Sequence, residues 1–183
     1  MKFESSKVVG RWNFAFYIYW DLDLPEPYLR TDLRSGDIGA LTRLHGLLYA
    51  REYGWDYTFE AYVAQGLAEF ALNFQPDRDR LWLADVAGEI VGSVAIFGRS
   101  AEEAQLRWYL VHPDYRGRGL GGKLLRMAVS FARECGFRCL YLWTTSDLTA
   151  AARQYLAAGF HKTESKTHLI WGKMVTEEKY QLI

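Results

Sequence analysis

Apolar residues recur along the chain at two different spacings, and these spacings predict a set of helices and strands. Between residues 37 and 72 the spacing is helical and predicts two helices, which Gly54 separates. Asp37 is placed to cap the first helix, whose apolar positions are Ile38, Leu41, Leu44, Leu47 and Leu48. The second helix is expected from about Phe59 to Leu72, before Pro76.

After residue 80 the pattern changes to short apolar runs that predict strands. Residues 81–85 and 89–97 are joined by Ala87-Gly88, which predicts an antiparallel hairpin. Further strands are expected over residues 28–33, 105–111, 138–144, 160–170 and 173–181, and further helices over 119–135 and 147–158. The predicted fold class is therefore α/β in the mixed (α+β) sense, with a central mixed sheet, partly parallel, flanked by about four helices.

The predicted domain covers residues 28–183, and the aromatic segment 1–27 stands apart as an N-terminal arm or an extra strand. Its run from Trp12 to Trp20 is too aromatic for a signal peptide and too short for a membrane span of about 20 residues. We expect this arm to lie in a homodimer interface, where it would pair with a neighbour's sheet or cover a pocket.

Composition narrows the function classes. Lys plus Arg and Asp plus Glu each number 22, so no global field would attract nucleic acid or an anionic membrane. The two cysteines, Cys135 and Cys139, match neither a disulfide framework nor a paired metal motif. We therefore expect a cytoplasmic protein that holds no metal and binds neither nucleic acid nor membrane.

The most informative stretch is Arg116-Gly117-Arg118-Gly119-Leu120-Gly121-Gly122-Lys123, between a predicted strand and a predicted helix. Glycines let backbone N–H groups converge on one point and the helix start adds partial positive charge, so the stretch predicts a phosphate site. A dinucleotide site is disfavoured, because His112–Arg116 separates the strand from the first glycine. A nucleoside-triphosphate loop is also disfavoured, because Leu124 stands where Ser or Thr would hold magnesium.

A third pattern, Arg-x-x-Gly-x-Gly after Val-His-Pro-Asp-Tyr, resembles the acetyl-CoA loop of the Gcn5-related N-acetyltransferase (GNAT) superfamily. The preceding strand 106–111 and the later run Arg153–Phe160 are similar to that family in the same order, and the resemblance covers about residues 28–181. It implies the GNAT fold and an enzyme that moves acetyl from acetyl-CoA to a primary amine of a small molecule or peptide. The implied reaction is direct attack in a ternary complex.

The resemblance also implies where acetyl-CoA binds. Its pyrophosphate would lie over the glycine loop, and its pantetheine arm would lie where the strand before the loop splays from the next one. The hydroxyl of Thr145 or Ser146 would bond the cofactor where relatives carry an asparagine, although helix capping by Ser146 or Asp147 is an alternative. The residues expected to bind acetyl-CoA are Leu110, Val111, Arg116, Gly117, Arg118, Gly119, Leu120, Gly121, Gly122, Lys123 and Thr145.

The catalytic groups are implied by the same resemblance. Tyr155 takes the position of the family's general-acid tyrosine, with packing as the alternative role. Many relatives carry a glutamate base where this chain has Gln105, so Glu103 and His45 are the candidates, with a packing histidine or a water chain as alternatives. The aromatic side chains expected to shape an acceptor pocket, or simply the core, are Tyr49, Trp55, Tyr57 and Trp108.

Residues 44–56 and 142–144 are similar to the acetyltransferase half of proteins that fuse a MarR-type winged helix to a GNAT domain. With 27 residues before the predicted domain we expect no winged helix, so DNA binding does not transfer. A second hypothesis stays open. The missing strand glutamate is also compatible with a domain that binds acetyl-CoA as a sensor without turnover.

Overall fold

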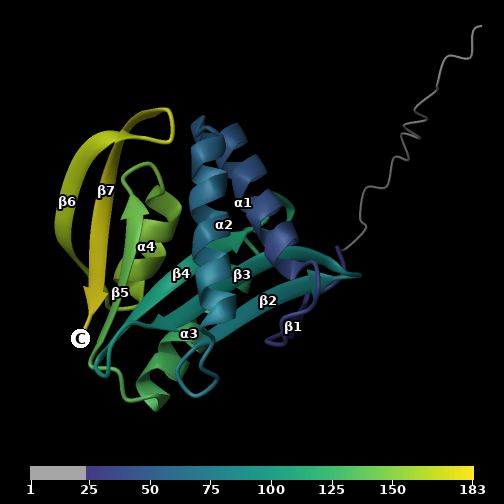
Figure 1. Cartoon of the computed structure of the whole chain (residues 1–183), viewed down its shortest axis with the longest axis vertical. Helices are drawn as coiled ribbons and strands as arrows, with labels where there is room; N and C mark the ends of the chain where they lie inside the picture. The colour runs from purple at the N-terminus through teal and green to yellow at the C-terminus, as the bar shows by residue number, and fades with distance from the viewer. Residues whose placement is uncertain (1–23) are drawn as a thin grey trace, which may run out of the picture.

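A computed structural model describes residues 24–183, which form a seven-stranded mixed sheet with helices packed on it (Figure 1). The strand order across the sheet is β1-β2-β3-β4-β5-β7-β6. The strands are β1 (Tyr28–Arg30), β2 (Arg80–Val86), β3 (Glu89–Gly98), β4 (Glu103–Val111), β5 (Cys139–Thr145), β6 (His161–Ile170) and β7 (Lys173–Leu182). The helices are α1 (Asp37–Tyr53), α2 (Tyr57–Leu72), α3 (Leu120–Glu134) and α4 (Thr149–Ala157), with a 3-10 turn, η1 (Pro113–Tyr115), before α3. This arrangement confirms the predicted fold class.

Alternation along the strands sorts apolar side chains onto the two faces of the sheet. From β2, Leu81 and Leu83 pack with α1 and α2, whereas Trp82 packs with α3. Tyr155 of α4 belongs to the same cluster as α3. Helices α1 and α2 therefore cover one face of the sheet, and α3 and α4 cover the other.

Two hairpins turn through pairs of residues with positive φ values. The predicted turn between β2 and β3 is confirmed, with φ of 52° at Ala87 and 90° at Gly88. The turn between β6 and β7 has φ of 51° at Trp171 and 80° at Gly172. A bulky side chain at positive φ is uncommon. Here the turn directs the indole of Trp171 toward Trp55, in the connection between α1 and α2, and toward Phe59 of α2.

The adjacent strands β4 and β5 part soon after they begin. Their parallel ladder pairs Glu103 with Cys139, Ala104 with Leu140 and Gln105 with Tyr141, and it ends there. Beyond this point β4 remains paired with β3, through a register shift between Ser93 and Ala95. The structure thus contains the splay between the two strands that the sequence resemblance predicts.

Two helix starts differ from their prediction. The N-cap of α1 is Gly36 with φ of 98°, and Asp37 does not cap the helix because its carboxylate pairs with Arg30 at 2.6 Å. Helix α4 starts at Thr149 behind Leu148, and no side chain caps it within the described chain. The capping role considered for Ser146 or Asp147 is therefore wrong.

Residues 1–23 of the predicted N-terminal arm lie outside the part of the chain that the structure describes. The predicted role of residues 1–27 in a homodimer interface therefore stays a prediction.

Candidate active site

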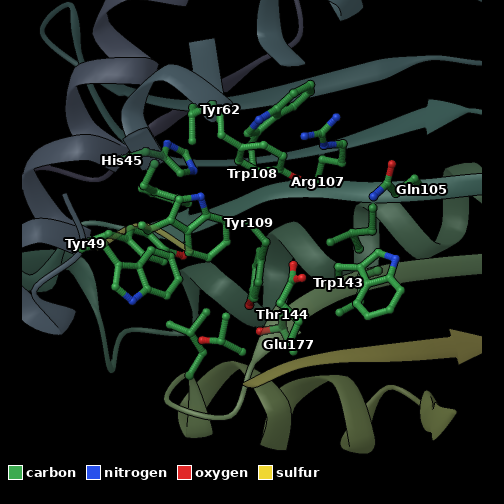
Figure 2. Close-up of a pocket in the computed structure, with 18 of the residues that line it drawn as sticks. His45, Tyr49, Tyr62, Gln105, Arg107, Trp108, Tyr109, Trp143, Thr144 and Glu177 are labelled. Carbon is green, nitrogen blue, oxygen red and sulfur yellow. The ribbon is translucent and has the colours of Figure 1, made fainter. Parts of the chain in front are cut away.

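Two adjoining cavities lie at the opening between β4 and β5. The first, here called the loop cavity, has a volume of about 180 Å³ and is lined by α1, the end of β4 and the start of α4, including Leu110, Val111 and Arg116. The second, here called the aromatic cavity, has a volume of about 100 Å³ and is drawn in Figure 2. Tyr49, Tyr109 and Leu148 line both cavities, so the two adjoin at these side chains.

The glycine loop joins η1 to α3 and follows the end of β4. Gly117 and Gly119 have φ of 75° and 83°, and their surfaces are open, with no atom within 4 Å of where a Cβ would stand. Gly119 is the N-cap of α3, and no described side chain caps this helix start. The N–H groups of Leu120, Gly121 and Gly122 open the first turn of α3, whose first intrahelical bond runs from the Lys123 N–H to the Gly119 carbonyl oxygen at 3.0 Å. N–H groups at such a helix start can receive an anion. The geometry fits a phosphate group.

Gly121 makes room for Tyr109 of β4. A Cβ at this glycine would stand 2.8 Å from the tyrosine hydroxyl oxygen and 3.2 Å from Oε1 of Gln154. The Tyr109 hydroxyl donates a hydrogen bond to Gln154 of α4. The glycine motif therefore serves packing between β4, α3 and α4 as well as anion binding.

Arg116 makes contacts that the sequence does not predict. Its Nη2 lies 2.9 Å from Oε1 of Glu52 in α1, and its Nε donates a 2.9 Å hydrogen bond to the carbonyl oxygen of Val111. Arg116 therefore ties α1 to the end of β4 beside the loop cavity. The cationic side chains of Arg118 and Lys123 are exposed.

His45 lies on α1 and lines the aromatic cavity with only 3% of its surface exposed. Its Nδ1 is 2.9 Å from the carbonyl oxygen of Leu41. Because a carbonyl oxygen can only accept, Nδ1 carries the proton and Nε2 keeps its lone pair. Nε2 is buried and has no hydrogen-bond partner among residues 24–183. Burial lowers the pKa of His45 to about 4, so the imidazole is neutral at pH 7.

Three further buried polar atoms of the aromatic cavity lack a partner in the described chain. They are the indole Nε1 of Trp55 and the hydroxyl oxygens of Thr144 and Thr145. Buried polar atoms in proteins are nearly always hydrogen-bonded. Four such atoms, His45 Nε2 included, therefore line one cavity, where water or a polar ligand would satisfy them. Thr145, which was expected to bind the cofactor, is one of the four.

Tyr155 lines the aromatic cavity from α4 and is buried. Its ring centroid lies 5.7 Å from that of Tyr109 and 6.0 Å from that of Tyr180. Burial, with smaller contributions from Tyr49 and Tyr109, raises the phenol pKa of Tyr155 well above its usual value. The hydroxyl therefore stays protonated at physiological pH, as a proton donor must.

Glu103 is not brought to either cavity. It is exposed at the start of β4, where its backbone carbonyl accepts hydrogen bonds from the N–H groups of Arg99 and Ser100. Gln105 does line the aromatic cavity, but its Oε1 accepts hydrogen bonds of 2.8 Å and 3.0 Å from the Arg99 guanidinium. Of the two predicted base candidates, only His45 therefore lies at the cavity.

The β6–β7 hairpin completes the aromatic cavity. The indole of Trp171 lies 4.3 Å from Trp55 and 4.9 Å from Phe59, measured between ring centroids. The backbone N–H of Asp56 donates a 3.0 Å hydrogen bond to the Trp171 carbonyl, so the hairpin docks on the connection between α1 and α2. The sequence gives no local signal for this contact, because its partners are distant in the chain.

Most of the aromatic residues predicted for an acceptor pocket do line this cavity. Tyr49, Trp55 and Trp108 are among its lining residues. Tyr57 is not, and 81% of its surface is exposed. Glu177 of β7 is a lining residue that the sequence does not indicate, since it stands in the charged run Glu177-Glu178-Lys179, which carries no motif.

A glycine loop at a helix start, beside two parallel strands that splay over buried tyrosines, defines a domain of the acetyltransferase class. The family model described as "Acetyltransferase (GNAT) family" matches residues 47–160. The chain belongs to the GNAT family of acetyltransferases.

Curated relatives are consistent with this family. The chain is 30% identical over 138 residues to the Xenopus laevis protein named "Probable N-acetyltransferase camello", an alignment that covers 70% of this chain and 62% of that protein. It is 38% identical over 82 residues to an Escherichia coli protein named "Uncharacterized N-acetyltransferase YjgM", covering 43% of this chain and 49% of that one. The chain thus spans less than two thirds of these relatives. The predicted closeness to MarR fusion proteins stays a prediction.

Solved structures share the fold at low sequence identity. Salmonella typhimurium yncA, whose structure contains its cofactor acetyl-CoA, matches with a TM-score of 0.63 at 21% identity, over 86% of this chain and 94% of that one. The ribosomal-protein-S18-alanine N-acetyltransferase of Escherichia coli matches with a TM-score of 0.62 at 20% identity, over 85% and 92% of the two chains.

Residues 24–183 contain neither a candidate membrane span nor a candidate metal site. No described helix has the length and apolar character needed to cross a membrane. No group of three or more His, Cys, Asp or Glu side chains in this part of the chain is arranged to hold a metal ion.

Proposed function

We propose that this protein transfers an acetyl group from acetyl-CoA to a primary amine by direct attack in a ternary complex. The observation that carries the proposal is the environment of His45. Its neutral, unpartnered Nε2 lines a cavity that adjoins the opening between β4 and β5. A base in that position can serve an amine that approaches from the aromatic cavity while the thioester enters from the loop cavity.

Acetyl-CoA would lie along the loop cavity. The N–H groups of the glycine loop and the start of α3 would receive its pyrophosphate. In the sheet ladder Leu110 and Val111 pair with Ser93 and Gly92 of β3, while the edge that faces β5 has no ladder partner. That edge would bind the pantetheine arm as an added strand. Membership of the GNAT family and the acetyl-CoA in the Salmonella yncA structure support this choice of donor.

In the proposed reaction the amine nitrogen attacks the thioester carbonyl carbon and an N–C bond forms. The nitrogen of the resulting tetrahedral adduct is much more acidic than a free ammonium group, so His45 Nε2 can accept its proton despite a low pKa. The C–S bond then breaks, and the Tyr155 hydroxyl donates a proton to the leaving sulfur. A proton passes back from His45 to Tyr155 through solvent, which leaves the N-acetyl product, free CoA and the starting enzyme.

Release of free thiol from acetyl-CoA by the purified chain, measured across a panel of primary amines, tests the proposal. His45→Gln and Tyr155→Phe should each lower kcat by about 100-fold or more, because each removes one proton-transfer group. The KM for acetyl-CoA should change little. Tyr180→Phe is the matched control for Tyr155→Phe, because Tyr180 is a buried tyrosine packed against Tyr155 that lines neither cavity.

Two results would contradict the proposal in different ways. If acetyl-CoA binds but no amine releases thiol, the domain is a sensor rather than a transferase. If His45→Gln turns over as fast as the unchanged protein, the base is another group or a water chain.

A further inference from the structure

Arg107 of β4 is a charged lining residue of the aromatic cavity that has no carboxylate within ion-pairing distance among residues 24–183. Its guanidinium carbon lies 4.7 Å from the ring centroid of Trp108 and 5.4 Å from that of Tyr62. The group also packs over Gly66 of α2, where a Cβ would stand 2.8 Å from Nη2. Burial, with a smaller contribution from the nearby Arg99, lowers the pKa of Arg107 from its usual value.

The other charges around Arg107 are already matched. Arg99, in the connection between β3 and β4, donates to Gln105 and pairs with Glu69 at 2.9 Å. Glu177, the carboxylate that lines the cavity, lies 2.7 Å from Nε2 of His168 and 3.2 Å from Nζ of Lys166. His45 is neutral. The cavity therefore presents one uncompensated positive charge, at Arg107.

The arrangement of the lining defines what a ligand must carry. Figure 2 shows Arg107, Trp108 and His45 along one side of the cavity, with Thr144 and Glu177 along the other. The neighbouring surface is aromatic and comes from Trp55, Phe59 and Trp171. A ligand that satisfies this lining needs an anionic group, a nucleophile within reach of His45 and an apolar body.

We propose that the acetyl acceptor is an amino-carboxylic acid whose carboxylate binds Arg107 and whose apolar or aromatic side chain packs against Trp55, Phe59 and Trp171. The planar guanidinium matches a carboxylate through two parallel hydrogen bonds. A simple alkylamine or an internal lysine of a protein carries no carboxylate and would leave the arginine unpaired. This inference rests on the proposed acetyl transfer and names its substrate class.

Matched pairs of acceptors provide the test. Thiol release is measured with phenylalanine against phenethylamine and with tryptophan against tryptamine, which differ in the carboxylate. The unchanged protein should prefer the amino acid by about 10- to 100-fold in kcat/KM after correction for the fraction of unprotonated amine. Arg107→Met should remove that preference, so that the kcat/KM values of the two members of each pair converge. Arg107→Lys keeps the positive charge but loses the paired hydrogen bonds of the guanidinium, so it should retain part of the preference for the amino acid.

A binding measurement separates failure of this inference from failure of the proposed function. Calorimetric titration of phenylalanine into the CoA-bound protein should give heat of binding that Arg107→Met abolishes while its thermal unfolding remains cooperative. If no amine releases thiol, acetyl transfer fails, and this titration still decides the role of Arg107. Equal kcat/KM for both members of each pair, or equal phenylalanine binding by the Arg107→Met protein, would overturn the inference.

Discussion

One hydrogen bond, from His45 Nδ1 to the carbonyl oxygen of Leu41, determines which nitrogen of the imidazole can act as a base. The acceptor is the residue one helical turn earlier in α1, so the helix itself selects the tautomer. The sequence places this histidine on a leucine-rich helix face, where a packing role and a catalytic role look the same. The unpartnered Nε2, which lines the aromatic cavity, favours the proposed role as a base.

The lowered pKa of His45 predicts a loss of stability in mild acid. The folded protein holds this pKa near 4, below the value of about 6.5 in an unfolded chain, so the unfolded state binds more protons between these values. Stability from this residue is therefore complete above pH 6.5 and falls as the pH drops toward 4. Between pH 7.5 and 5 the free energy of unfolding should fall by about 2 kcal/mol more in the unchanged protein than in His45→Phe. Urea titrations of both proteins at the two pH values measure this difference, and parallel losses would contradict it.

At the scale of elements, the start of α3 contains two neighbouring glycines whose surroundings differ. Gly121 lies against the Tyr109 hydroxyl, whereas a Cβ at Gly122 would meet only the end of the flexible Arg126 side chain, at 3.2 Å. Both glycines are within the first helical turn. Glycine is therefore required by packing at position 121, whereas packing does not require it at position 122.

Paired alanine substitutions should reveal this difference. Gly122→Ala should leave acetyl-CoA binding intact and raise the free energy of unfolding by up to about 1 kcal/mol, because alanine favours the helix. Gly121→Ala should displace Tyr109, weaken acetyl-CoA binding and lower stability by about 1–3 kcal/mol. Calorimetry with acetyl-CoA and denaturant titration of both variants check these outcomes. Similar behaviour of the two variants would show that Tyr109 does not depend on the glycine.

The β6–β7 hairpin is a second element whose shape serves the site. Its turn holds Trp171 at a positive φ, and Lys173 Nζ donates a 3.1 Å hydrogen bond to the carbonyl oxygen of Tyr53. Trp171→Asn keeps a residue that tolerates this backbone but removes the indole. We expect the KM of the acceptor to rise at least 10-fold, while the KM for acetyl-CoA stays unchanged. The reason is that the indole lines the aromatic cavity and does not line the loop cavity. Steady-state kinetics test this, with Trp171→Phe as the control that should retain most of the affinity.

At the scale of the whole molecule, a buried arginine joins the first strand to the rest of the fold. Arg30 of β1 is 5% exposed and pairs with Asp37 of α1 at 2.6 Å and with Asp85 of β2 at 3.0 Å. The arginine holds the pKa of Asp37 below its usual value. Strand β1 is three residues long, and this ion network adds to its short ladder with β2 in holding it in place.

Removal of that arginine should destabilise the protein strongly. Arg30→Met leaves two carboxylates without their partner and should lower the free energy of unfolding by about 3–5 kcal/mol. Arg34→Met breaks the exposed pair with Asp32, which lies at 2.6 Å, and should cost less than about 1 kcal/mol. Thermal and urea unfolding of the two variants measure both values. A loss of similar size in both would show that burial does not decide the strength of the pair.

The sequence was sufficient to predict the element order, the β2–β3 hairpin and the glycine loop, because periodicity and turn residues are local signals. It also indicated His45 and Tyr155. It did not indicate Arg107, Glu177 or Trp171 as parts of one cavity, because strands β4 and β7 and a turn bring them together only in the folded sheet. Glu103 was expected near the site from its strand position, but the splay begins beyond it.

The position of β7 between β5 and β6 has a consequence for synthesis of the protein in the cell. As the chain leaves the ribosome, α1, α2 and β4 emerge well before Trp171, so the aromatic rings of Tyr49, Trp55 and Phe59 are exposed while translation continues. Strand β6 emerges next, but its pairing partner in the sheet is β7, which is translated after it. The glycine loop can therefore form on a nascent chain before the aromatic cavity does. Until β7 has paired with β5, those uncovered rings are a surface for chaperones or for aggregation.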